Sequence, residues 1–194
     1  MDLFDTNTTF ERQLFAKAAR NRIPLYGVLE LLPLCNLNCD MCYVHLSKQE
    51  IQSQGRLRSL DEWISLAKQM KDAGTLFLLL TGGEPLLFPQ FKELYCVLKD
   101  MGMILTLNTN GTLINEEWAE FFAKNKPRRI NITLYGSKNE TYENLCHMKD
   151  GFDKTIRGIE LLKKYKIDVK INGSLVKKNF HDRMEIIDIG EKYD

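Results

Sequence analysis

The chain has 194 residues, of which 44% are hydrophobic and 27% are charged, and its formal net charge is +1. This composition excludes a disordered chain, and the balanced charge argues against a dedicated binder of nucleic acid or of anionic membranes. The first residues lack the basic and apolar pattern of an export signal, and no segment approaches the roughly 20 apolar residues of a membrane span. We therefore expect a cytoplasmic protein that makes no contact with a membrane.

The predicted elements alternate between strands and helices. Residues 1–24 are expected to form a helical or flexible segment, with apolar residues at Phe10, Leu14 and Ala18, and residues 25–194 to form one domain. Apolar runs of strand length follow at residues 25–32, 75–80, 103–108, 129–135 and 168–176. Helical spacing is found at residues 59–74, 89–102, 115–125, 152–165 and 181–194, whereas the polar residues 47–59 are expected to form a solvated loop. Apolar strands joined by helices predict an α/β fold with a parallel sheet and right-handed crossovers.

Polar or glycine-bearing segments follow four of the predicted strands. They read PLCNLNCDMC (33–42), TGGEP (81–85), NTNG (108–111) and YGS (135–137). In parallel α/β folds, ligands bind beyond the carboxyl ends of the strands. The sequence therefore predicts a functional site on this rim of the sheet.

The first of these segments holds three cysteines, Cys35, Cys39 and Cys42, within eight residues. Disulfides are disfavoured in a reducing cytoplasm, and clustered thiols there more often bind a metal. Three thiolates can hold three corners of an iron–sulfur cube, but they also suit zinc, for which His45 would complete a Cys3His set. The spacing alone leaves both possibilities open.

The second segment, TGGEP, follows a strand of apolar residues. Paired glycines at Gly82 and Gly83 allow the backbone to approach a ligand closely, and Glu84 adds a carboxylate. The alternative interpretation is an ordinary turn from strand to helix, with Pro85 setting the next turn.

CNLNCDMC followed by TGGEP one βα unit later resembles the radical S-adenosylmethionine (radical SAM) superfamily, in particular its peptide- and protein-modifying, SPASM-type branch. The resemblance implies a partial (βα) barrel in which Cys35, Cys39 and Cys42 bind three irons of a [4Fe-4S] cluster. It further implies that S-adenosylmethionine binds the fourth iron and is cleaved reductively to a 5′-deoxyadenosyl radical, which modifies a peptide or protein substrate. An external electron donor of the flavodoxin or ferredoxin type is implied as well.

The same resemblance assigns residues to S-adenosylmethionine. Gly82, Gly83 and Glu84 would meet its ammonium group, and Thr133 its ribose hydroxyls. Tyr43 would border the adenine. Leu175 and Val176 would form an apolar floor beneath it.

The sequence departs from the family pattern in two respects. Relatives in this branch often carry an arginine after the fourth strand for the cofactor carboxylate; here the candidates are lysines, Lys138, Lys149 and Lys177. We expect a core that is truncated after about the fifth βα unit and lacks a SPASM extension, and therefore an oligomer or a completing partner at the open sheet edge. The competing hypotheses are a non-catalytic Cys3His zinc module that includes His45, and an inactive radical SAM fragment.

Overall fold

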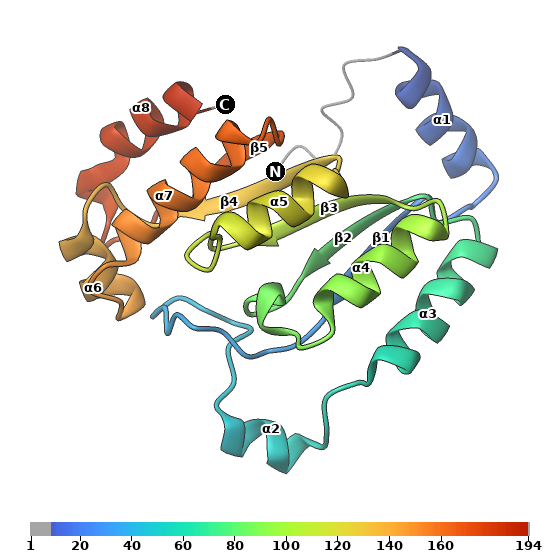
Figure 1. Ribbon diagram of the computed structural model, residues 1–194, viewed down its shortest axis with the longest axis horizontal. Helices are drawn as coiled ribbons and strands as arrows, with labels where there is room; N and C mark the ends of the chain where they lie inside the picture. Colours follow the sequence, from blue (N-terminus) through green and yellow to red (C-terminus); the bar gives the residue numbers. More distant parts are fainter. Residues whose placement is uncertain (1–8, 194) are drawn as a thin grey trace.

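Five parallel strands form the frame of the protein, as Figure 1 shows. The structure is a computed structural model that describes residues 9–193. The strands are β1 Tyr26–Glu30, β2 Phe77–Thr81, β3 Ile104–Thr109, β4 Arg129–Leu134 and β5 Val169–Gly173, and they lie side by side in chain order. All five predicted strands and the parallel α/β architecture are confirmed. The fifth strand is shorter than predicted, so Leu175 and Val176 lie beyond its end.

The two faces of the sheet differ in burial. Along β3 and β4 every second side chain is buried, including Leu105, Leu107, Ile130 and Ile132. The intervening side chains are only half-buried and lie on the opposite face, because side chains alternate along a strand. The buried face is covered by helices, and the half-buried face is the inner surface of a partial barrel.

Helices α3, α4, α5 and α7 lie in a row across the buried face of the sheet (Figure 1). Their bounds are α3 Leu60–Asp72, α4 Phe91–Asp100, α5 Glu116–Lys124 and α7 Gly151–Lys164, and α8 Arg183–Tyr193 packs beside β5. The short turns η1 Pro85–Leu87 and η2 Phe180–Asp182 lie after β2 and before α8. Ser59 and Glu62 form the expected capping box of α3, and the Asn115 side chain caps α5. The predicted helices are therefore confirmed.

Two helices were not predicted. The segment expected to be a loop contains α2 Lys48–Gln54, so that prediction was wrong. Ser47 and Glu50 start this helix with a capping box, but none of its residues is buried, and it therefore lacks the apolar periodicity that reveals a helix in a sequence. The second helix, α6 Asn139–Cys146, has only eight residues.

Helix α1 Thr9–Arg20 covers the amino-terminal ends of the strands (Figure 1). Phe15 stacks on Phe77 of β2 with ring centroids 5.4 Å apart, and Ala18 and Leu25 are buried beside them. The helical spacing predicted around Leu14 and Ala18 is confirmed, and the part of the prediction that concerns residues 1–8 lies outside the described residues. Within residues 9–193 no helix is long and apolar enough to cross a membrane.

Candidate functional site

A cavity of about 260 Å³ lies at the carboxyl-terminal rim of the sheet. We call it the rim pocket, and we call residues 31–46, which cross the rim after β1, the cysteine loop. The residues that line the rim pocket come from the cysteine loop and from the ends of β2 to β5. They are Cys35, Leu37, Cys39, Met41, Cys42, Tyr43, Val44, Thr81, Gly82, Gly83, Asn108, Thr109, Asn110, Thr133, Tyr135 and Ser174. The structure thus brings the three clustered cysteines together with Tyr43, Gly82, Gly83 and Thr133.

Two of the cysteine sulfurs accept hydrogen bonds from the loop backbone. The Cys35 sulfur accepts from the amide of Leu37 at 3.4 Å, and the Cys42 sulfur from the amide of His45 at 3.3 Å. Burial raises the pKa of the Cys35 thiol to about 11. A positive metal centre nearby would favour its thiolate form.

The third cysteine, Cys39, is hydrogen-bonded to Cys146, which ends α6. This contact lowers the pKa of Cys39 and raises that of Cys146. Cys146 is fully buried, as is typical of a small core residue, and its carbonyl accepts a hydrogen bond from the amide of Asn38 at 3.1 Å. The C-terminal end of α6 therefore holds the cysteine loop in place through these two contacts.

The donor chemistry of the loop fits an iron–sulfur cluster, because three soft thiol ligands line one cavity. In the part of the chain that the structure describes, no three His, Cys, Asp or Glu side chains converge closely enough to hold a metal as they stand. His45 is not among the residues that line the pocket.

The paired glycines are required by the chain's own packing. A Cβ on Gly82 would lie 2.5 Å from the Leu32 carbonyl oxygen, and one on Gly83 would lie 2.3 Å from that of Leu34. The amide of Gly83 donates to the Leu32 carbonyl at 2.7 Å, and the amide of Glu84 donates to that of Leu34 at 2.8 Å. The TGGEP segment therefore lies directly against the root of the cysteine loop, which holds the two motifs in register.

Glu84 lies behind the pocket wall and is fully buried. Its carboxylate accepts hydrogen bonds from the Thr109 hydroxyl at 2.8 and 2.9 Å, from the Asn110 amide at 2.9 Å and from the Leu86 amide at 3.1 Å. Burial raises the pKa of this carboxyl to about 7, although the three donors oppose the shift. In this arrangement Glu84 joins the loop after β2 to the loop after β3.

A further network, which the sequence did not single out, reaches from Glu84 to the cysteine loop. The Asn110 side-chain amide donates to the Asn36 side chain at 2.9 Å and to the Cys35 sulfur at 3.6 Å. Thr112 joins it by donating to Asn110 and accepting from Asn36. The predicted strand-end loop NTNG located these residues but gave no indication of their partners, which are about 75 positions away in the chain.

Asp40 fixes the far side of the cysteine loop. Its carboxylate contacts the His147 ring at 2.8 Å and forms an ion pair with Lys178, which lies beyond β5. Both contacts lower the pKa of Asp40, with the hydrogen bond to Lys178 contributing most. The loop that begins at β1 is thereby attached to the opposite side of the sheet.

Three residues assigned to S-adenosylmethionine do not line the rim pocket: Glu84, Leu175 and Val176. Leu175 is 46% exposed, and Ser174 occupies the place after β5 instead. None of the candidate lysines Lys138, Lys149 and Lys177 lines the pocket either. The roles assigned to all these residues stay predictions.

The family model that describes the radical SAM superfamily matches residues 29–189 of this chain. This chain belongs to the radical SAM superfamily. A superfamily member similar to it is the AdoMet-dependent heme synthase of Methanosarcina barkeri, 31% identical over 90% of this chain and 49% of that protein. Another is the subtilosin biosynthesis protein AlbA of Bacillus subtilis, 30% identical over 88% of this chain and 38% of that protein.

Solved structures of radical SAM proteins share the fold. Streptococcus suis SuiB bound to its precursor peptide SuiA superimposes with a TM-score of 0.72 at 22% identity, covering 95% of this chain and 42% of that one. SuiB bound to S-adenosylmethionine gives the same TM-score, covering 91% and 41%. The radical SAM chain described here spans about half the length, or less, of these relatives.

Family membership confirms the resemblance drawn from the cysteine and glycine motifs, and with it the partial barrel. The superfamily is one of enzymes, and its cofactors are a [4Fe-4S] cluster and S-adenosylmethionine.

Proposed function

We propose that this chain is the core of a radical SAM enzyme that cleaves S-adenosylmethionine reductively and modifies a peptide or protein substrate. When bound, the cluster and S-adenosylmethionine supply an electron and a carbon radical that removes a hydrogen atom from the substrate. An external electron donor of the flavodoxin or ferredoxin type is part of the proposal.

The observation that carries the proposal is the shared wall of the rim pocket. Three thiols of one loop, the TGGEP glycines and a hydroxyl at the end of β4 all line one cavity. A zinc-binding module gives no reason for the glycines and the strand-end hydroxyl to lie beside the thiols. A site for a cluster and a nucleoside cofactor needs all of them.

Each residue has a defined task in this proposal. Cys35, Cys39 and Cys42 hold the cluster, and the backbone of Gly82 and Gly83 meets the cofactor ammonium with its carbonyl groups. The Thr133 hydroxyl and Tyr43 contact the nucleoside, to which Ser174 adds a second hydroxyl. Glu84 acts as a positioning residue, because its carboxylate is occupied by Thr109, Asn110 and Leu86.

The side chains on the inner face of the barrel favour a peptide as the substrate. Asn108 lines the pocket and accepts a hydrogen bond from the Asn131 side chain at 2.7 Å, so amide groups lie beside the cofactor space. Amides match the donors and acceptors of a peptide main chain. The SuiB complex with a precursor peptide and the biosynthesis protein AlbA give further support.

Electron paramagnetic resonance on anaerobically reconstituted, reduced protein tests the proposal. We expect a cluster signal that shifts when S-adenosylmethionine is added. Cys35→Ala should lower bound iron by about tenfold or more, since a lost ligand costs at least as much as a lost outer-shell contact. The matched control is Cys96→Ala on α4, a half-buried cysteine outside the pocket, which should keep both iron and shift.

A His45→Ala variant separates the zinc hypothesis from the cluster hypothesis. If the cysteines hold a cluster, bound iron is unchanged. Zinc in the purified protein that is lost in this variant, together with no cofactor-dependent shift in the wild type, would overturn the proposed function.

A further inference from the structure

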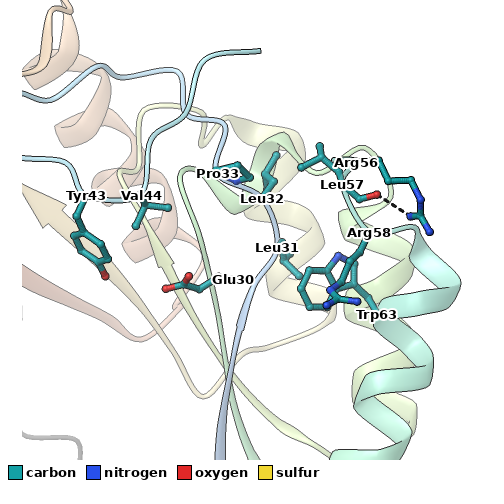
Figure 2. Close-up of a pocket in the computed structure, with 10 residues that line it drawn as sticks. All are labelled: Glu30, Leu31, Leu32, Pro33, Tyr43, Val44, Arg56, Leu57, Arg58 and Trp63. Atoms are coloured by element: carbon teal, nitrogen blue, oxygen red, sulfur yellow. Dashed lines mark hydrogen bonds between the residues drawn. The ribbon is translucent and has the colours of Figure 1, made fainter. Parts of the chain in front are cut away.

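A second cavity, of about 370 Å³, lies beside the rim pocket at the end of β1, and Figure 2 shows its lining. We call it the edge groove. It is formed by residues 30–33, by residues 56–58 between α2 and α3, and by Trp63 in the first turn of α3. Tyr43 and Val44 line both the edge groove and the rim pocket. The two cavities are therefore neighbours that share one wall.

Trp63 carries an unsatisfied hydrogen-bond donor. The residue is only 7% exposed. Its indole Nε1 is the one buried side-chain nitrogen or oxygen without a partner among residues 9–193. Leaving a buried N–H unpaired is costly, and native structures rarely do so without a reason such as a missing partner. Trp63, which lines the groove, thus carries a donor for which the described residues supply no acceptor.

Arg58 lies over the ring that carries this donor. Its guanidinium lies 5.6 Å from the centroid of the Trp63 ring, and the residue itself is exposed (Figure 2). An exposed cation–π contact is weak, so an incoming group displaces Arg58 at little cost. Its neighbour Arg56 is already engaged, because it donates to both oxygens of Glu62 at 2.7 and 2.8 Å. Arg58 is therefore the cation that an anionic ligand group in the groove would meet.

The groove also runs along an open strand edge. β1 is the first strand of the sheet and pairs only with β2 in the described residues. The amide of Leu31 donates to Thr81 of β2 at 2.9 Å, so the backbone groups of Glu30 face the other way, because successive residues of a strand alternate in direction. An extended peptide can pair with such an edge through its main chain.

We propose that the edge groove binds an extended segment of the peptide substrate next to the residue that is modified, with an acidic side chain at Arg58. This inference rests on the proposed function. A main-chain carbonyl of the segment accepts the hydrogen bond of Trp63 Nε1, and the segment continues past Tyr43 and Val44 into the rim pocket. The Glu30 carboxylate also lines the groove, and its negative charge disfavours a second acidic residue of the peptide beside it.

Peptide binding to the reconstituted chain tests this proposal. The probe is a capped heptapeptide of alternating threonine and valine with one central glutamate, and its counterpart carries a central lysine. Trp118→Phe removes the other tryptophan, so that the fluorescence of Trp63 reports binding. We expect the glutamate peptide to bind about tenfold more tightly, and Arg58→Gln to remove that preference.

Two variants complete the test. Trp63→Phe should weaken the binding of both peptides about fivefold, measured with a fluorophore on the peptide, because the phenyl ring cannot donate the hydrogen bond. The smaller ring also loses packing in the core, so binding is measured well below the unfolding midpoint of the variant. Arg183→Gln is the matched control, since this guanidinium also lies over a ring, that of Phe180, but outside the groove. It should bind both peptides as the wild type does.

The outcomes separate this inference from the proposed function. Equal affinity for the two peptides, no effect of Arg58→Gln, or no binding at about 1 mM peptide would overturn the inference, because main-chain pairing does not require one particular sequence. None of these results alters the cofactor-dependent resonance shift, which Arg58→Gln and Trp63→Phe should both retain. Loss of the shift in the wild type would instead refute the proposed function.

Discussion

The two ends of the sheet are built on different principles. The amino-terminal end is closed by α1 through apolar contacts such as the stack of Phe15 on Phe77. The carboxyl-terminal end is held by close backbone contacts at Gly82 and Gly83 and by hydrogen bonds around a buried Glu84. Apolar contacts are non-directional and tolerate small changes, whereas the polar end depends on exact placement. We therefore expect substitutions at either end to lower the stability, but only those at the carboxyl-terminal end to impair function.

The largest loss of stability is expected where two backbone segments are in close contact. In Gly83→Ala the new Cβ would lie 2.3 Å from the Leu34 carbonyl oxygen and 2.7 Å from that of Pro33. Because neither atom belongs to a flexible side chain, the two loops must separate, and we expect unfolding to become easier by about 3 kcal/mol. Urea unfolding followed by circular dichroism measures the change, and the S-adenosylmethionine shift should disappear with it.

The matched control for this substitution is Gly190→Ala in α8, where a Cβ meets nothing within 4 Å. Replacing a helical glycine by alanine where the Cβ has open space should add about 0.5–1 kcal/mol of stability. Equal stability losses in the two variants would show that Gly83 is not constrained by the cysteine loop.

A smaller effect is expected at the apolar end. Phe15→Ala removes the ring that stacks on Phe77, and since Phe15 is half-buried we expect a loss of about 2 kcal/mol. Phe10→Ala on the same helix is the control, because that ring is 70% exposed and its removal should change stability by less than about 0.5 kcal/mol. Bound iron and the resonance shift should persist in both variants. Their loss in Phe15→Ala alone would mean that the two ends are coupled.

The last effect is a dependence of stability on pH that arises from Glu84. Its pKa is raised from 4.5 to about 7 in the folded protein, so between these values the folded state holds a proton that the unfolded state has released. Stability contributed by this group should therefore fall as the pH rises from about 4.5 to about 7 and then level off. Glu84→Gln does not titrate, and the difference in urea midpoint between wild type and variant should follow that curve. A difference that does not vary with pH would exclude this assignment.

Much of the fold follows from local patterns in the sequence. The strands at residues 75–80 and 103–108 are apolar runs that end in polar loops, and the helix after Ser59 has both halves of its capping box. Helix α2 escaped prediction because it is held by local capping and buries nothing. Periodicity reports burial, so an exposed helix leaves no periodic signal.

Several of the predicted site residues come together in the rim pocket, but the contacts among them were not predictable. The cysteine and glycine motifs mark the positions of the rim pocket because they follow strand ends. The hydrogen bond from Asn110 to Cys35 and the contact of Cys39 with Cys146 join residues that only the folded chain brings together. The glycines were expected to admit a ligand, whereas the space they leave is filled by the backbone of Leu32 and Leu34.

The attachment of Asp40 to His147 and Lys178 has a consequence for biosynthesis. The partners are 107 and 138 positions further along the chain, so the ribosome makes the cysteines long before it makes the residues that fix their loop. At a synthesis rate of about 5–20 residues per second, the 138 intervening positions correspond to about 7–28 s. During this interval the cysteine loop lacks the contacts that later fix Asp40. Iron delivered to the finished chain would instead bind to a loop whose position is already fixed.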